Sequence, residues 1–168
     1  MKKSLLVLFI ALVFTGCQAK SYNPVIDTSF CYDAIFTTGD FSFSATIEKI
    51  ENNVKITVND TLAKGLVITY NGTDITFTKD SLTYTLDGDD IDKTNPAIII
   101  FDVFSAMQNI DNLTVQKTKN GFEYVGKTSV CQFVFIQNDD NTYKSILIPD
   151  MDVTIEFETL WCYNYKLK

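Results

Sequence analysis

Residues 95–110, Asn-Pro-Ala-Ile-Ile-Ile-Phe-Asp-Val-Phe-Ser-Ala-Met-Gln-Asn-Ile, form the one stretch of the chain whose pattern clearly predicts a helix. Asn95 suits the N-cap position, and Pro96 suits the first helical turn, where its missing N–H costs nothing. Apolar side chains occupy nearly every face of this helix, which is typical of a helix enclosed by protein. The sequence therefore predicts one apolar helix at the centre of the fold.

Short alternating segments on both sides of this helix are typical of antiparallel strands with one face exposed to water. Before the helix, residues 41–48 alternate between apolar and polar side chains, and Asn71-Gly72 signals a two-residue hairpin. After the helix, residues 151–158 give the clearest alternation, whereas residues 130–136 are apolar on both faces. The helix is thus flanked by two series of strands.

The predicted fold is mainly β, of the α+β class. We expect a strongly curved antiparallel sheet or incomplete barrel of about ten strands, with the apolar helix packed in its concave face. Residues 25–39 carry no clear pattern and fit either a short helix or an irregular edge segment.

The first residues have the composition of an export signal. Two lysines follow Met1, residues 5–14 are an apolar run too short to span a bilayer, and Thr15-Gly16 places small residues directly before Cys17. This arrangement resembles the signal of bacterial lipoproteins, in which the segment before the cysteine is removed and the cysteine becomes the lipid-modified N-terminus. The alternative is an ordinary secretory peptide followed by a chance cysteine.

The lipoprotein resemblance implies a division of the chain. Residues 1–16 would be the signal peptide, Cys17 the lipid anchor, residues 17–25 a polar tether and residues 26–168 a single domain. Cys17 would carry acyl chains such as palmitate and hold the domain at the extracytoplasmic face of a cell membrane.

The charge of the chain disfavours nucleic acid as a partner. The formal net charge is −7, and it becomes −9 once Lys2 and Lys3 leave with the signal. The sequence contains no arginine and no histidine. Nucleic acids and anionic lipid head groups are therefore poor partners, because a basic patch is needed to neutralise their phosphates.

The sequence also lacks the groups that most enzymes use. Without histidine there is no ordinary base near neutral pH, and neither a nucleophilic serine elbow nor a phosphate-binding loop is present. A cysteine nucleophile would lack its usual histidine partner. The sequence predicts a non-enzymatic protein with no catalytic residue and no cofactor.

Two groups of residues are candidates for a metal site or a disulfide. Cys31, Cys131 and Cys162 match no metal motif, and they fit buried small side chains, with a Cys31–Cys162 bridge as the alternative. The acidic loop of residues 87–92 offers oxygen ligands for Ca²⁺, but its spacing differs from the EF-hand pattern. We predict a solvated loop and no metal site.

The order of parts resembles the bacterial lipoprotein-carrier fold, called LolA/LolB-like. The matching parts are the lipoprotein signal, strands that include residues 64–76, a helix opened by Asn95-Pro96, and four closing strands. In that family helices cover a curved, incomplete barrel, and the space between them holds acyl chains or other lipid. The resemblance implies a hydrophobic ligand, although this chain lacks a clear N-terminal helix and an arginine for the cavity.

A curved sheet with bulky inner residues either packs shut or leaves a dry cavity that suits hydrocarbon. In the first case the protein is a non-enzymatic surface interaction module with a closed core, and the loop of residues 87–92 is the candidate face for a protein partner. In the second case it binds or carries a hydrophobic ligand. The residues predicted to line the ligand cavity are Phe43, Ile68, Phe77, Phe101, Phe104, Met107, Phe133, Ile155 and Phe157.

Overall fold

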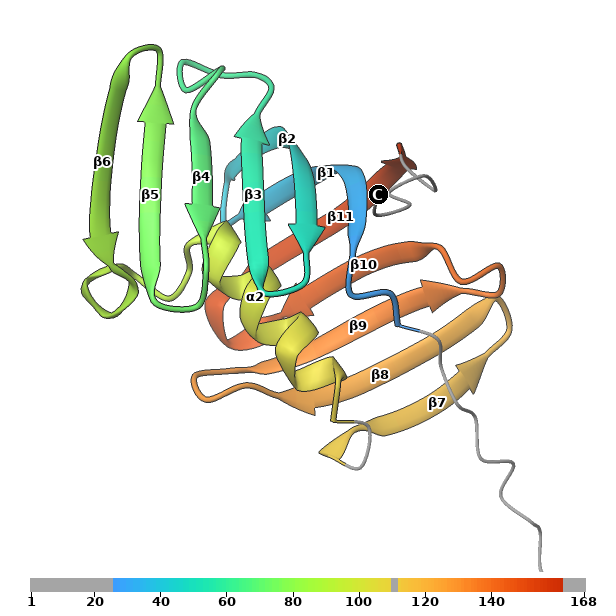
Figure 1. Ribbon diagram of the computed structural model, residues 1–168. Coiled ribbons are helices and arrows are strands. Elements are labelled where there is room, and N and C mark those ends of the chain that lie inside the picture. Colours follow the sequence, from blue (N-terminus) through green and yellow to red (C-terminus); the bar gives the residue numbers. More distant parts are fainter. Residues whose placement is uncertain (1–25, 110–111, 162–168) are drawn as a thin grey trace, which may run out of the picture.

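The computed structural model describes residues 26–109 and 112–161, which form one 11-stranded antiparallel sheet and one α-helix (Figure 1). The elements are β1 (Phe30–Thr38), β2 (Phe41–Ile50), β3 (Asn53–Val58), β4 (Val67–Tyr70), β5 (Asp74–Lys79), β6 (Leu82–Asp87), η1 (Gly88–Asp90), α2 (Pro96–Met107), β7 (Thr114–Thr118), β8 (Gly121–Lys127), β9 (Gln132–Asn138), β10 (Tyr143–Ile148), η3 (Pro149–Met151) and β11 (Val153–Leu160).

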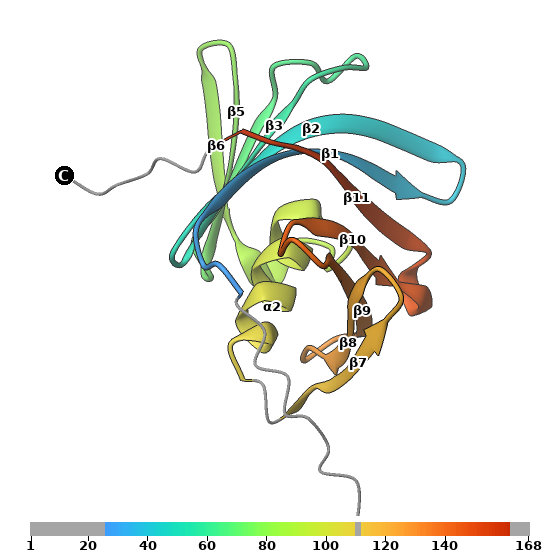
Figure 2. The ribbon, with the colours of Figure 1, turned by 90° about the vertical axis from the view of Figure 1, so that its right-hand side faces the viewer.

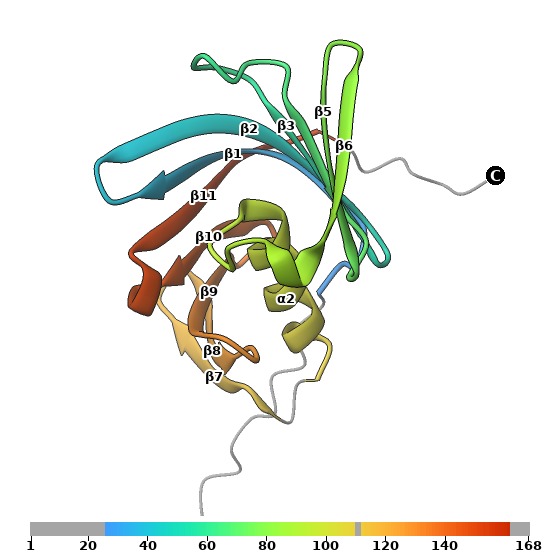
Figure 3. The same cartoon turned by 90° about the vertical axis from the view of Figure 1, so that its left-hand side faces the viewer.

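The sheet consists of two meanders that meet at its centre. The strand order is β6-β5-β4-β3-β2-β1-β11-β10-β9-β8-β7, so the first and last strands of the chain are neighbours and β6 and β7 are the two edges. The sheet curves around α2, which lies in its concave face (Figures 2 and 3). The predicted fold class, an open curved sheet around one apolar helix, is confirmed.

The prediction for the segment before residue 40 is wrong. These residues form β1, a nine-residue strand that pairs with β2 on one side and β11 on the other. Phe30, Tyr32, Ala34 and Phe36 are buried on one face, but Cys31 on the other face is buried too. A central strand covered in this way shows little contrast between its faces, so the period of two is hard to see in the sequence.

The helix begins as predicted. Pro96 is its first residue, and the Asn95 side chain accepts a hydrogen bond of 3.0 Å from the backbone N–H of Ala97. The helix ends at Met107, and Ile110, the end of the predicted stretch, lies outside the described residues. Within the described part of the chain, no helix is long and apolar enough to cross a membrane.

An aromatic cluster packs the middle of the helix against the sheet. The Phe104 ring lies 4.6 Å from that of Phe30, 5.3 Å from that of Tyr143 and 5.6 Å from that of Phe135, measured between ring centroids. Phe104 is only 1 % exposed. Edge-to-face and tilted ring pairs of this kind stabilise a core beyond their buried area, so the helix is firmly held at this level.

Candidate ligand-binding groove

Three neighbouring phenylalanines lead from the core to one rim of the curved sheet. The Phe36 and Phe43 rings face each other across β1 and β2 with centroids 5.1 Å apart, and Phe41 follows 5.9 Å from Phe43. Phe36 is buried, Phe43 is half-buried and Phe41 is 56 % exposed. Apolar surface therefore continues from the interior to solvent at the end of the sheet where β1 turns into β2.

Two pockets adjoin at this rim, beside the first turn of α2. They have volumes of about 180 and 110 Å³ and share Phe41, Phe43 and Pro96. The first is otherwise lined by Val58, Thr61, Ala63, Leu66 and Ile68. The second is otherwise lined by Phe36, Thr37, Thr38, Thr94, Ile99 and Val153.

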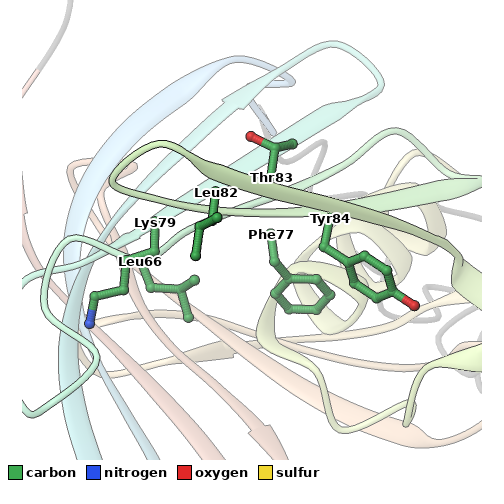
Figure 4. Close-up of a pocket in the computed structure, with 6 residues that line it drawn as sticks. All are labelled: Leu66, Phe77, Lys79, Leu82, Thr83 and Tyr84. Atoms are coloured by element: carbon green, nitrogen blue, oxygen red, sulfur yellow. The ribbon is translucent and has the colours of Figure 1, made fainter.

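A third pocket extends this surface along the edge of the sheet. It has a volume of about 350 Å³, shares Leu66 with the first pocket, and is lined also by Phe77, Lys79, Leu82, Thr83 and Tyr84. Figure 4 shows Phe77, Leu82 and Tyr84 on one side of β6, with Thr83 pointing away. We call the three adjoining pockets the rim groove.

The strand register explains why these side chains gather. Tyr84 is directly opposite Phe77, and Phe77 is directly opposite Ile68, so the three lie in one row across β6, β5 and β4. Because successive residues of a strand alternate between faces, Leu82 lies on the same face as Tyr84, two residues away. The groove is thus an unfilled continuation of the sheet's inner, core-forming face.

The groove is almost wholly apolar. Lys79 is the one charged residue among the described residues that line it, and its Nζ donates a hydrogen bond of 2.9 Å to the carbonyl of Leu62. Leu62 lies in the β3–β4 loop, between the groove-lining residues Thr61 and Ala63, and is 100 % exposed. Leu62 therefore adds exposed apolar surface next to the groove.

The nine residues predicted to line a cavity fall into two groups. Phe43, Ile68 and Phe77 line the rim groove. The others pack in the interior or against the helix, and they are Phe101, Phe104, Met107, Phe133, Ile155 and Phe157.

Phe101 shows what these packed residues do. Its ring lies 5.1 Å from that of Tyr70, and a Cβ added at Gly72 would stand 2.7 Å from its Cζ. Gly72 has a φ of +96°, which favours glycine. Phe101 therefore holds the helix against the β4–β5 turn.

The carboxylate of Asp102 is the one charge on this apolar helix. Burial raises the pKa of Asp102, and the positive charge of Lys93 lowers it in part. Burial also raises the pKa of Tyr70, with Asp102 adding to the effect. Asp102 does not line the groove, and its burial disfavours the charged form of the carboxyl group.

The carboxylates of the acidic loop, residues 87–92, form hydrogen bonds and an ion pair with neighbouring residues. Asp87 accepts a hydrogen bond from the N–H of Asp89, Lys93 lies 3.2 Å from Asp89, and Asp92 accepts hydrogen bonds from Thr94 that lower its pKa. Among residues 26–109 and 112–161, no three His, Cys, Asp or Glu side chains are grouped to hold a metal ion.

Cys31 and Cys131 are both buried, as the sequence predicts for small apolar side chains. Cys162, the other half of the alternative bridge, lies outside the described residues, so that bridge stays a prediction. Cys17, the predicted anchor, and the tether also lie outside them.

Several groove residues were not foreseen from the sequence, namely Phe41, Leu66, Leu82, Tyr84 and Pro96. A signal for some of them exists, because Phe41 and Leu82 each begin a strand directly after a turn that contains an aspartate. Apolar residues at strand ends next to polar turns cannot be fully covered by their own strand. Such residues indicate that one rim of the sheet is apolar, but they do not show which rim it is.

The comparisons with known proteins concern the N-terminal residues and the chain as a whole. Residues 1–18 match the family profile described as prokaryotic membrane lipoprotein lipid attachment site. A search of curated proteins gave no match. The crystal structure of a LolA superfamily protein from Nitrosomonas europaea is similar with a TM-score of 0.41 and 9 % sequence identity, covering 84 % of this chain and 89 % of that chain. The first residues of the chain therefore carry the features of a membrane lipoprotein lipid attachment site.

Proposed function

We propose that this lipoprotein binds or carries a lipid acyl chain in the rim groove and is not an enzyme. Cys17 is the lipid-modified residue, and it holds the domain at the extracytoplasmic face of the membrane. Residues 17–25 can span about 30 Å when extended, at about 3.4 Å per residue. The folded domain therefore stays close to the bilayer, which would supply the ligand.

The observation that carries this proposal is the continuous apolar lining of the groove at an open rim. Hydrocarbon that leaves water for such a surface gains about 0.8 kcal/mol per methylene. One of the three pockets shares lining residues with each of the other two, and such a succession of pockets suits a chain better than a compact molecule. Of the nine residues predicted to line a cavity, we assign ligand contact to Phe43, Ile68 and Phe77.

The test is binding of a fluorescent fatty acid to the purified chain from Gln18 onward, with and without Phe43→Glu. A carboxylate at position 43 would lie where two of the pockets join. We expect it to weaken binding at least about tenfold, since a loss of 1.4 kcal/mol suffices for that change. Native mass spectrometry of the unchanged chain is expected to show co-purified lipid.

Val125→Glu is the matched control. Val125 is an exposed apolar residue on β8 that lines none of the three groove pockets, and the substitution adds the same charge. Equal binding by the unchanged chain and by Phe43→Glu would rule out the groove. Absence of both bound lipid and fatty-acid binding would favour a surface module with a closed core.

A further inference from the structure

Strand β6 is an edge strand without the usual protection. It pairs with β5 over six consecutive residues without a register shift, and its other side is unpaired within the sheet. Proteins commonly protect such an edge with lysine, proline or a bulge, and β6 has none of these. Its apolar residues are well exposed, Leu82 at 78 % and Tyr84 at 63 %.

The hydrogen-bond pattern shows which backbone groups of β6 point outward. The N–H of Gly88 donates to the carbonyl of Thr73 at 2.7 Å, which fixes the alternation of the β5–β6 ladder. Counting back from this pair, Leu86, Tyr84 and Leu82 direct their backbone groups to β5. Thr83 and Thr85 direct theirs to the open side.

The sequence of this edge reads the same in both directions, as Leu82-Thr83-Tyr84-Thr85-Leu86. A two-fold symmetric contact requires a surface that is complementary to itself. We infer that β6 pairs antiparallel with β6 of a second copy of this chain, on a two-fold axis at Tyr84. Tyr84 then faces Tyr84 of the second copy, Thr83 faces its Thr85, and Leu82 faces its Leu86.

This register pairs the outward backbone groups of β6 and also matches side chains on both faces of the sheet. The outward N–H and C=O groups of Thr83 meet those of Thr85 in the second copy, which makes a hydrogen-bonded pair, and Tyr84 occupies a non-hydrogen-bonded position. On the outer face, the threonine pairs Thr76–Thr85 (3.0 Å between hydroxyl oxygens) and Thr78–Thr83 (3.3 Å) continue into the second copy. Such cross-strand pairs each stabilise a sheet modestly.

Like charges are not directly opposite each other within β6 in this register. In this register Asp87 lies opposite Ser81 of the second copy, so no two like charges face each other within the strand. On the inner face, Tyr84 lies beside Tyr84 of the second copy, and Leu82 lies beside its Leu86. The pairing therefore also joins the two rim grooves along their β6 sides.

The contact is expected to depend on membrane anchoring. One edge strand buries less than the roughly 1,000 Å² that a stable interface needs in solution. Two copies anchored in one membrane have a much higher effective concentration, which favours weak contacts. The second copy is thus a partner on the membrane surface.

The test is cysteine cross-linking of the full lipidated chain in its membrane. Cα atoms of a non-hydrogen-bonded antiparallel pair are about 4.5 Å apart, which falls within the range for a disulfide. Tyr84→Cys is expected to give a covalent dimer on a non-reducing gel after mild oxidation. The unaltered chain, treated in the same way, gives the background from its own cysteines.

Thr83→Cys is the matched control, because position 83 faces position 85 of the second copy and lies too far from its own equivalent. It is expected to give no dimer above background alone, but a dimer when co-expressed with Thr85→Cys. Equal cross-linking of Tyr84→Cys and Thr83→Cys would indicate random collision and overturn the pairing, as would no dimer from either.

This inference is separate from the acyl-chain proposal. Adding Phe43→Glu to Tyr84→Cys weakens fatty-acid binding under the proposed function but leaves the cross-link unchanged. Either proposal can therefore fail while the other stands.

Discussion

At the scale of single residues, the effect of burying Asp102 on the free energy of unfolding can be measured. It lies on the helix that the sheet encloses, where burial raises its pKa and Lys93 offsets the effect only in part. A carboxyl whose pKa is higher in the folded state keeps its proton when the unfolded chain has already lost it. The free energy of unfolding therefore falls as pH rises through this interval.

We expect Asp102→Asn to raise the melting temperature at pH 7. The gain should shrink as pH falls and vanish well below the ordinary aspartate pKa of about 3.9, where the carboxyl is protonated in both states. Thermal unfolding at pH 7 and at pH 3 measures the difference. Asp40→Asn, in the exposed β1–β2 turn, is the control, and an equal gain from it would attribute the effect to net charge alone.

At the scale of elements, the start of α2 carries a separate prediction. Asn95→Ala removes the side-chain oxygen that accepts the Ala97 N–H, and an N-cap loss of this kind costs about 1 kcal/mol. Denaturant unfolding should show a lower midpoint with an unchanged slope. Ser105→Ala, at an exposed site within the same helix, should change the stability by less than about 0.5 kcal/mol.

The helix and the amphipathic strands were predictable because their signals are local. Asn95, Pro96 and the apolar run after them specify a capped, enclosed helix without reference to the rest of the chain. The prediction of Asn71-Gly72 as the two-residue hairpin was less exact. In the structure Asn71 pairs with Asp74, and the two central residues of the β4–β5 turn are Gly72 and Thr73. The Asn71 side chain accepts hydrogen bonds from Thr73 and Asp74, and this places it before the turn instead of within it.

At the scale of the whole molecule, the position of the groove was not predictable from composition. Phe43 and Phe104 look alike in the sequence, yet one lies at the open rim and the other in the aromatic cluster. The difference depends on how far α2 extends along the concave face, since its first residue, Pro96, is where the rim groove begins. That distance is a property of the assembled sheet.

The exposed rim gives a prediction for the anchored protein. Leu62 stands fully in water beside the groove, and we expect it to enter the membrane interface when lipid is exchanged. Leu62→Glu should slow the uptake of a fluorescent lipid from vesicles several-fold, because a carboxylate at the interface opposes insertion. Binding of a dispersed fatty acid should be unchanged.

Thr73→Glu is the control for that experiment. Thr73 is exposed in the β4–β5 turn, at the other end of the same strands, and the substitution adds an equal charge. If both variants slowed uptake equally, net charge and not Leu62 would be responsible.

The strand order has a consequence for how the chain reaches its folded state. Because β1 pairs with β11, the centre of the sheet joins the beginning of the folded region to its end. The first six strands can form their hairpins as they emerge, but β1 keeps an open side until the final strand arrives. Closing such a long loop is slow, so a newly made chain passes through a stage in which β1 and β11 are not yet paired. At that stage it most needs protection from self-association.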